Sequence, residues 1–264
     1  MDVIVTAGGV PAPGEPLYPV TQGKPKALIP ILGRPMIAYV LDALLGSKQV
    51  GRVVIAGLPP EAIAGLPGPL ISLPSQGGML ENIEAGLECL RRSEAPSEYV
   101  LICSSDVPLI TPEVVNFVIN AYLRQPGYDL YYTVVEKSVM EARFPGSRRT
   151  YARIKEGAFT GGDLTLLRLN PPDTPRDLWQ KLIAARKSPW RQAELIGFWP
   201  LIKFITRRFT IADAERLAVK VGRMRGRVVI SPYPELAMDV DKPGQLAIIE
   251  QELARRAQSV ASSR

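Results

Sequence analysis

Residues 2–9 read DVIVTAGG, a short run of β-branched residues that leads directly into a glycine pair. Similar strand-forming runs follow at 52–56, 70–73 and 99–103. Between them, apolar residues recur every three or four positions, which predicts helices at 35–45, 79–92 and 112–123. Regular alternation of strands and helices is typical of βαβ units. The sequence therefore predicts an α/β fold, a three-layer Rossmann-like arrangement around a mostly parallel sheet.

The second half of the chain adds a helical block to this pattern. We expect strands at 128–135 and 227–231, and a hairpin of 150–155 and 158–160 around Glu156-Gly157. Helices are expected at 175–186, 189–207, 211–221 and 243–256. We therefore predict a single domain over residues 1–256 with an α-helical insertion at about 173–221, followed by a frayed tail at 257–264.

The predicted insertion is amphipathic and rich in aromatic residues. These are Trp179, Trp190, Phe198, Trp199 and Phe204. Packing into the core explains such a pattern in many proteins. A cap over a substrate pocket, a homodimer interface and a contact with lipid are the alternatives.

The composition of the chain excludes several kinds of chemistry. It contains 46% hydrophobic and 22% charged residues, which is typical of a globular protein. There is no histidine, so a histidine triad, relay or zinc site is excluded, and Cys89 and Cys103 lack metal-ligand spacing. Any general base, metal ligand or phosphate-binding group must therefore come from Asp, Glu, Lys, Arg, Asn, Ser or backbone amides.

The distribution of apolar and charged residues bears on location and partners. A strand predicted from Asp2 leaves no room for a signal peptide, and no apolar run reaches the roughly 18 residues of a membrane span. We therefore expect a cytoplasmic protein without stable membrane insertion. The net charge of +6 suits an anionic substrate, but its basic residues are scattered, so we expect no nucleic-acid partner.

The loop after the first strand offers a site for phosphate groups. Ala7, Gly8 and Gly9 have little or no side chain, so their backbone amides can approach phosphate oxygens closely. An ordinary tight turn is the alternative. Lys26, within GKPKAL at 23–28, adds a cation that would offset negative charge on those oxygens. A solvated loop lysine is the alternative for Lys26.

Residues 75–82 (SQGGMLEN) connect a predicted strand to a predicted helix. Gln76 and Asn82 carry both hydrogen-bond donors and acceptors, which recognition of a nucleotide base requires. Gly77 and Gly78 would allow a ligand to approach the backbone. Capping of the helix by this loop is the alternative.

Acidic residues follow one strand and precede the last helix. Asp106, in SSDVPL at 104–109, lies at the tip of a buried strand, where a carboxylate is unfavourable unless a cation meets it. In MDVDKP at 238–243, Asp239 and Asp241 point to the same side of an extended segment, so both could face one cation. An N-cap for the last helix is the alternative role of Asp241.

The order of these segments resembles a known family. A strand, AGG at 7–9, PKAL at 25–28, GRPM at 33–36 and a helix are similar to nucleotidyltransferases of the molybdenum-cofactor guanylyltransferase (MobA-like) type, relatives of the sugar-phosphate nucleotidyltransferases. The resemblance covers residues 2–246 apart from the insertion. It implies the nucleotide-diphospho-sugar transferase fold and transfer of a nucleoside monophosphate, with release of pyrophosphate.

The resemblance also implies roles for the residues named above. Ala7, Gly8, Gly9 and Lys26 would hold the triphosphate of the nucleotide. Its base and ribose would contact Gln76, Gly77, Gly78 and Asn82. Lys26 and Asp106 would be catalytic, and Mg²⁺ would be bound by Asp106 together with Asp239 or Asp241.

Gly161, Gly162 and Asp163 resemble the turn that faces the acceptor in sugar-phosphate nucleotidyltransferases. A turn that needs positive φ explains the two glycines equally well. The nearby Arg143, Arg148 and Arg149 could hold an acceptor phosphate, with solvated arginines as the alternative.

One departure from the family pattern lies in the first loop. Related enzymes carry a phosphate-binding arginine a few residues after the first glycines, whereas residues 10–22 of this chain are rich in proline and contain no arginine. Either another cation such as Lys24 replaces it, or the triphosphate is bound more weakly or in a different arrangement. The proline-rich segment is expected to form an ordered lid.

The activity expected from these observations is Mg²⁺-dependent transfer from a nucleoside triphosphate to a phosphorylated small molecule, such as a sugar phosphate or a cofactor phosphate. A phosphate monoester is mostly ionised near neutral pH, so the reaction needs no general base, in agreement with the lack of histidine. Two alternatives stay open: a glycosyltransferase that uses a nucleotide sugar, and a non-catalytic nucleotide-binding protein of the same fold.

Overall fold

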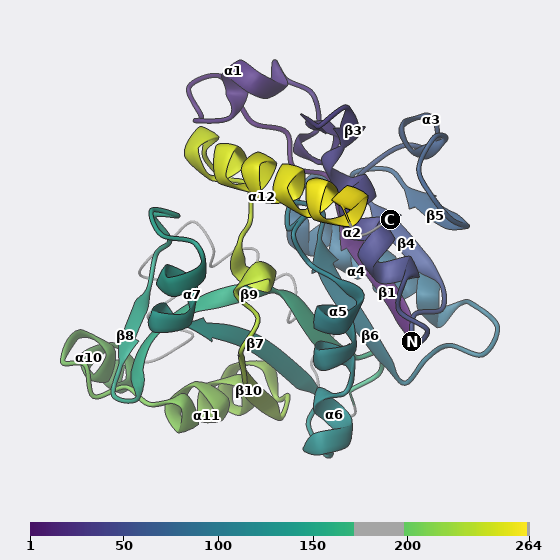
Figure 1. Cartoon of the computed structure of the whole chain (residues 1–264). Coiled ribbons are helices and arrows are strands. Elements are labelled where there is room, and N and C mark those ends of the chain that lie inside the picture. Colours follow the sequence, from purple (N-terminus) through teal and green to yellow (C-terminus); the bar gives the residue numbers. More distant parts are fainter. Residues whose placement is uncertain (172–197, 263–264) are drawn as a thin grey trace.

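The computed structural model of the chain describes residues 1–171 and 198–262 (Figure 1). Its main sheet has eight strands. Four of them are parallel neighbours in the order β6-β1-β4-β5: β1 (Asp2–Thr6), β4 (Val53–Ala56), β5 (Leu70–Leu73) and β6 (Tyr99–Ser104). These strands form the predicted parallel half of the sheet.

The other half of the sheet is built around a long strand, β9 (Gly157–Arg168). It pairs antiparallel with β6, with β7 (Leu130–Glu136) and with β8 (Ala152–Ile154), while β10 (Gly226–Ser231) joins β7 in parallel. Within the described sheet, β9 therefore runs against all its neighbours. The predicted mostly parallel α/β sheet is confirmed.

Alternating side chains of the central strands build the two sides of the core. Val3 and Val5 of β1 face one apolar cluster, and Ile4 between them faces the other; all three are fully buried. This is the period of two that a strand imposes on its side chains. A strand covered on both faces reads as a continuous apolar run, as residues 3–5 do.

Helices cover both faces of the sheet. On one face lie α2 (Met36–Leu45), α5 (Pro112–Ile119) and α12 (Pro243–Ser262), of which α5 and α12 cross in front of the sheet in Figure 1. On the other face α4 (Met79–Arg91) packs Ile83, Leu87 and Leu90 against Ile4. The result is the three-layer arrangement expected from the sequence.

The remaining described elements complete the fold, and apart from α11 (Ile211–Gly222) they are short. The helical ones are α1 (Tyr18–Thr21), η1 (Lys26–Leu28), α3 (Pro60–Ile63), α6 (Ala121–Arg124), α7 (Lys137–Arg143), α10 (Phe198–Ile205), α11 (Ile211–Gly222) and η2 (Pro234–Ala237). A two-stranded ribbon consists of β2 (Pro30–Ile31) and β3 (Arg34–Pro35).

Three predicted elements differ from the structure. The helix expected at 112–123 is divided at Asn120 into α5 and α6. The second hairpin strand, expected to end at Thr160, continues to Arg168 because it pairs with both β6 and β7. Helix α12 extends to Ser262 rather than Arg256. The helix predicted at 175–186 and the first part of that at 189–207 lie outside the described residues, whereas α11 forms as expected.

A search of the described residues for a membrane-spanning helix found none, since no helix among them combines the necessary length with sufficient apolar character.

Candidate active site

The candidate site lies at the carboxyl ends of the parallel strands, where ligands bind in open α/β sheets. The loop after β1 is fixed there by hydrogen bonds from Ala7 N to Ala56 O (2.8 Å) and from Lys26 N to Gly9 O (2.8 Å). The second of these bonds brings Lys26 beside the glycine pair, although 16 residues lie between Gly9 and Lys26. The predicted glycine loop and lysine therefore belong to one site.

A cleft of about 450 Å³ opens above this edge of the sheet. It is lined by six of the residues expected to contact the nucleotide and by Asp106, the expected catalytic and metal-binding residue; the six are Gly8, Gly9, Lys26, Gly77, Gly78 and Asn82. The sequence did not single out its other lining residues: Thr6, Val10, Met79, Ser104 and Ser105. Its size lies within the range of small-molecule sites in proteins.

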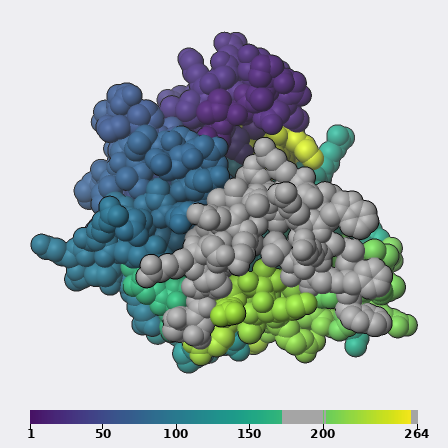
Figure 2. Space-filling view, turned by 180° about the vertical axis from the view of Figure 1, so that it is seen from behind, coloured from purple at the N-terminus to yellow at the C-terminus, as the bar shows by residue number. Residues whose placement is uncertain are grey.

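A second cavity, of about 340 Å³, adjoins the first and shares Gly9, Val10 and Lys26 with it. The proline-rich segment forms one side through Pro11, Glu15, Pro16 and Leu17, and Asp241 contributes to the lining as well. Figure 2 shows the purple N-terminal residues at the top of the molecule, standing above the blue part of the chain that follows. The segment after the glycine loop thus borders the site.

Two residues predicted to contact the nucleotide, Ala7 and Gln76, do not line the cleft. Ala7 is only 2% exposed. The Gln76 side chain donates to Pro74 O (2.9 Å), and Gln76 lines a separate groove together with Glu81 and Glu84. Asn82 lines the cleft but also holds the loop, because its Oδ1 accepts a hydrogen bond from Gln76 N (2.7 Å).

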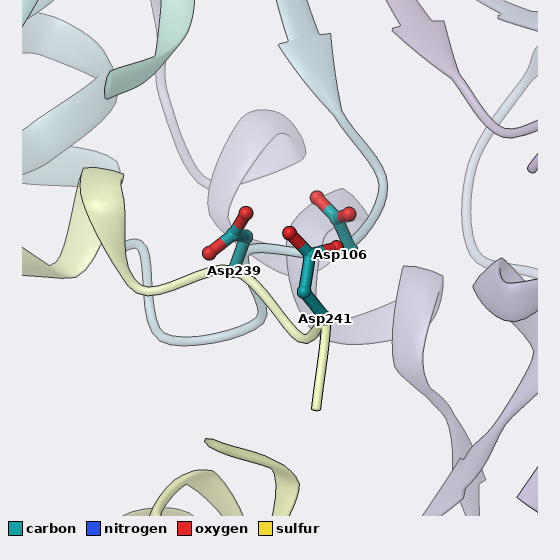
Figure 3. Close-up of side chains that lie close together, drawn as sticks. All are labelled: Asp106, Asp239 and Asp241. Carbon is teal, nitrogen blue, oxygen red and sulfur yellow. The ribbon is translucent and has the colours of Figure 1, made fainter. Parts of the chain in front are cut away.

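Three carboxylates lie close together, of which Asp106 lines the cleft and Asp241 lines the second cavity. Asp106, Asp239 and Asp241 each offer an oxygen, and these oxygens lie within 4.8 Å of one another. Figure 3 shows that Asp106 projects from the loop after β6, whereas Asp239 and Asp241 project from the segment that precedes α12. Asp106 and Asp239 are buried, and Asp241 is exposed. Oxygen ligands in such a cluster suit a hard divalent cation such as Mg²⁺.

Backbone and hydroxyl contacts bring the two acidic segments together. Val240 N donates to Asp106 O (3.0 Å), which joins the segment before α12 to the loop after β6. Ser104 Oγ donates to Asp106 Oδ1 (2.5 Å) and fixes the orientation of the carboxylate. Because Asp106 and Val240 are 134 positions apart in the sequence, the cluster depends on the whole fold.

Lys26 lies between two of these carboxylates. Its Nζ is 2.5 Å from Asp106 Oδ2 and 2.9 Å from Asp241 Oδ1. Burial alone would lower the pKa of Lys26, but the negative charges of Asp106 and Asp241 outweigh it and raise the pKa. Lys26 is therefore a cation at physiological pH.

The third carboxylate, Asp239, has a different cationic partner. The Arg149 guanidinium contacts the Asp239 carboxylate, and each side chain is only 12% exposed. Gln245, at the start of α12, links the acidic segment before α12 to the segment that contains Arg149. Its Oε1 accepts hydrogen bonds from Asp241 N and Lys242 N (2.9 Å each), and its Nε2 donates one to Ser147 O (3.3 Å). Arg149 appeared in the sequence as a candidate for binding acceptor phosphate, and its contact with Asp239 could not be predicted.

The prediction that residues 160–163 form a turn is wrong, because the backbone there is part of a strand. Gly161, Gly162 and Asp163 lie inside β9, and neither glycine is among the residues with positive φ. The pairing of β7 with β9 shifts register here, since Tyr132 pairs with Thr165 and Val134 with Gly161. The stretch is therefore an irregularity of the strand, of the kind that redirects side chains near active sites.

Asp163 faces the acidic cluster from this irregular stretch. Its Oδ2 is buried and has no hydrogen-bond partner within residues 1–171 and 198–262. Burial raises the pKa of Asp163 and nearby Asp106 raises it further, whereas Arg149 lowers it, which leaves a pKa of about 7. Gly162 has no room for a side chain, because a Cβ there would overlap Leu236 and Thr133.

Comparison with known proteins identifies the family. Residues 19–171, more than half of the chain, match the MobA-like NTP transferase domain. The chain belongs to the MobA-like NTP transferase family. The resemblance seen in the sequence and the expected class of enzyme, a nucleotidyltransferase, are thereby confirmed.

Relatives of this MobA-like transferase include a solved structure of a hypothetical transferase from Thermus thermophilus. The two are 37% identical, with a TM-score of 0.80 over 93% of this chain and 98% of that one. The 2-C-methyl-D-erythritol 4-phosphate cytidylyltransferase of Streptomyces avermitilis is 26% identical over 95% of this chain and 92% of its own length. The bifunctional protein GlmU of Rhodospirillum rubrum is 33% identical over 99 residues, and this match spans 22% of its length.

Proposed function

We propose that the protein transfers a nucleoside monophosphate from a nucleoside triphosphate to a phosphorylated small molecule, with Mg²⁺ as cofactor and pyrophosphate as the second product. The observation that carries this proposal is the convergence of Gly8, Gly9, Lys26 and Asp106 on one cleft at the carboxyl edge of the sheet. A nucleotide in this cleft would meet backbone amides, a cation and a carboxylate within one space.

The part of the cleft formed by Gly8, Gly77, Gly78 and Asn82 suits the base and ribose. Gly77 has a φ of +101°, a conformation that side chains disfavour, so the loop can present its backbone closely to a ligand. Gly8 is packed against Asn82: a Cβ on Gly8 would lie 2.5 Å from Asn82 Nδ2. The triphosphate would then extend along the glycine loop toward Lys26.

The residues of the acidic cluster fit Mg²⁺. Asp106, Asp239 and Asp241 supply oxygen ligands close to one another, and two cations, Lys26 and Arg149, already contact them. When bound there, Mg²⁺ would neutralise charge on the phosphate oxygens. The proposed ligands are Asp106 with Asp239 or Asp241.

The chain's own residues position the reactants. An oxygen of the acceptor phosphate would attack the α-phosphorus, the bond from that phosphorus to the bridging oxygen would break, and pyrophosphate would leave. Lys26, a cation with its Nζ at the junction of the two cavities, would stabilise the negative charge that develops on the α-phosphate. No proton transfer from the attacking oxygen is required, because a phosphate monoester is mostly ionised at neutral pH.

Among the described residues that line the second cavity, Lys26 is the only cation that could take the place of the missing arginine of the first loop. The proline-rich side of this cavity contributes Glu15 rather than a cation, and Glu15 Oε2 accepts a hydrogen bond from Ala12 N (3.0 Å). Lys24 is exposed. We propose that Lys26 and backbone amides carry most of the contact with the triphosphate.

The full-length similarity to a cytidylyltransferase that acts on a phosphorylated polyol supports a sugar phosphate or a related phosphate monoester as acceptor. Asp163 and the irregular stretch of β9 face the same cluster and stay our candidates for the acceptor side of the site.

The test is pyrophosphate release from each of the four common nucleoside triphosphates with Mg²⁺ and a panel of sugar, polyol and cofactor phosphates. One combination should release pyrophosphate, and Asp106→Asn should abolish the release. Lys26→Met should slow it by about 100- to 1000-fold, as loss of a group that stabilises transition-state charge does. Lys24→Met is the matched control and should act like the wild type or nearly so.

The outcome that contradicts the proposal is transfer of a sugar from a nucleotide sugar, with no pyrophosphate released from any triphosphate. This result would place the protein with the glycosyltransferases instead. Tight nucleotide binding without consumption of any acceptor would favour a non-catalytic role.

A further inference from the structure

Arg149 is a largely buried cation, with 12% of its side chain exposed, and it contacts a proposed metal ligand directly. It lies in the segment between α7 and β8, and its guanidinium contacts the carboxylate of Asp239. Its Nε is also buried and has no hydrogen-bond partner among the residues that the structure describes. Arg149 is therefore held by one carboxylate and retains an unused donor in a place that solvent does not reach.

Two cations offset part of the negative charge of the three carboxylates, and they do so at two separate places. Lys26 contacts Asp106 and Asp241, and Arg149 contacts Asp239. Asp163 interacts electrostatically with both Asp106 and Arg149: the charge of Asp106 raises the pKa of Asp163, and the charge of Arg149 lowers it. Buried carboxylates need positive partners, so these two side chains stabilise the cluster in the absence of a metal.

A divalent cation that enters this cluster meets two positive charges already in place. The cation and the guanidinium repel each other, and both are attracted to the same carboxylate of Asp239. Lys26 has a clear alternative partner in the triphosphate. For Arg149, the unused Nε donor and the unpaired Oδ2 of Asp163 show that polar groups beside the contact are not yet satisfied.

We propose that Arg149 is the counter-ion of the metal centre in the absence of metal. Its guanidinium pairs with the Asp239 carboxylate until a metal ion binds there. The guanidinium is then displaced by the metal and becomes available to bind an anionic group of the acceptor. This inference rests on the proposed function, since it takes Asp239 as a metal ligand. Arg149 is thus a positioning residue. Because linkage is reciprocal, metal and acceptor anion strengthen each other's binding through it.

The experiment measures Mn²⁺ binding by electron paramagnetic resonance to the full-length protein without nucleotide, in the presence and absence of inorganic phosphate. Arg149→Met removes the competitor, so we expect it to bind Mn²⁺ about tenfold more tightly than the wild type, within the usual range of coupling between sites. Phosphate should strengthen Mn²⁺ binding to the wild type but not to this variant.

Arg148→Met is the matched control. Arg148 is the exposed neighbour of Arg149, so this variant should bind Mn²⁺ like the wild type. Arg149→Lys keeps the positive charge and should restore weaker Mn²⁺ binding. It also preserves a measurement if Arg149→Met does not fold. Complexes of Mn²⁺ with phosphate in solution are the same for all variants and cancel in the comparison.

Two negative results have different meanings. If the wild type binds no Mn²⁺, the proposed metal centre is wrong, and with it the proposed function. If the wild type binds Mn²⁺ but Arg149→Met binds it equally or more weakly, the metal centre stands and the role of Arg149 as counter-ion is overturned. The same holds if phosphate strengthens Mn²⁺ binding to the wild type and to Arg149→Met alike.

Discussion

Gly8 shows how a single residue shapes the cleft. A Cβ at Gly8 would lie 2.5 Å from Asn82 Nδ2 and 3.3 Å from Ser75 Oγ, whereas a Cβ at the adjacent Gly9 would meet nothing within 4 Å. Asn82 in turn holds the Gln76 amide. The absence of a side chain at Gly8 is therefore a packing requirement of the protein itself, and at Gly9 it leaves space for a ligand.

Substitution of the two glycines by alanine should separate these roles. We expect Gly8→Ala to lower the free energy of unfolding by about 1–3 kcal/mol, as overpacking of a closely packed site does. Gly9→Ala should leave stability nearly unchanged but weaken nucleotide binding. Urea denaturation measures the first effect and titration with nucleotide the second; equal loss of stability in both variants would contradict the assignment.

Local sequence was sufficient to identify some candidate site residues but not the residues that they contact. Lys26 and Asp106 stand in recognisable segments beside predicted strands, so both could be identified as candidates without a structure. The contact of Arg149 with Asp239 joins positions 90 residues apart, and no local pattern predicts it. Resemblance to the acceptor-facing turn of sugar-phosphate nucleotidyltransferases predicts a turn at Asp163 and its two preceding glycines, whereas the structure places all three in a strand.

Among the elements, the start of α12 organises the acidic cluster. Gln245 is 3% exposed and bonds three backbone groups: the amides of Asp241 and Lys242 and the carbonyl of Ser147. The two amides belong to the acidic segment, and the carbonyl belongs to the segment of Arg149. A glutamine near the start of a helix that binds back to preceding amides resembles half of a capping box.

Removal of the Gln245 side chain should disturb stability and metal binding together. Gln245→Ala removes the partner of the buried Ser147 carbonyl, at about 1–3 kcal/mol for an unsatisfied buried group, and also frees the amides of Asp241 and Lys242. We expect a lower unfolding temperature and weaker Mn²⁺ binding, because the segments of Asp241 and Arg149 lose their connection. Gln251→Ala, an exposed position on the same helix, is the control. Unchanged Mn²⁺ binding in Gln245→Ala would show that the cluster is positioned without it.

At the scale of the whole molecule, α12 contacts segments that are distant in the sequence, namely α7 and the segment that follows Asp106. Glu252 contacts Arg143 of α7 and accepts hydrogen bonds from Arg255 and Arg256 (2.9 Å each to Oε1). Arg256 also donates to Leu109 O (2.9 Å), in the segment that follows Asp106. Burial alone would raise the pKa of Glu252, but these arginines outweigh it and lower the pKa to about 2.

The depressed pKa of Glu252 leads to a prediction for stability against pH. In the unfolded chain a glutamate has a pKa of about 4.3, so the arginine contacts stabilise the fold above that pH and lose their effect as the pH falls toward about 2. We expect Glu252→Gln to destabilise the protein at pH 7 by about 1–2 kcal/mol, a modest value because solvent screens the exposed Arg255. The difference from the wild type should shrink below pH 4.

Chemical denaturation at several pH values measures this difference, with Glu250→Gln on the same helix as the control. A loss of stability that is the same at pH 7 and at pH 3 would mean that packing, rather than charge, explains the effect of Glu252→Gln.

The parallel half of the fold could be predicted from the sequence because its strands are apolar runs separated by amphipathic helices, and each of these signals is local. The other half could not be predicted in the same way. Strand β9 is defined by pairing with both β6 and β7, and its direction relative to them is a property of the assembled sheet. The site lies where the two halves meet, so its acidic cluster required the whole fold.

The central claim, that the cleft binds a nucleoside triphosphate with Mg²⁺, is tested most directly by thermal unfolding with each triphosphate, with and without Mg²⁺, in the wild type and in Asp106→Asn. One triphosphate should stabilise the wild type when Mg²⁺ is present, by about 2.7 kcal/mol at 100 times its dissociation constant. Asp106→Asn should lose most of this gain. Unfolding temperatures that do not respond to any triphosphate with Mg²⁺ would contradict the account.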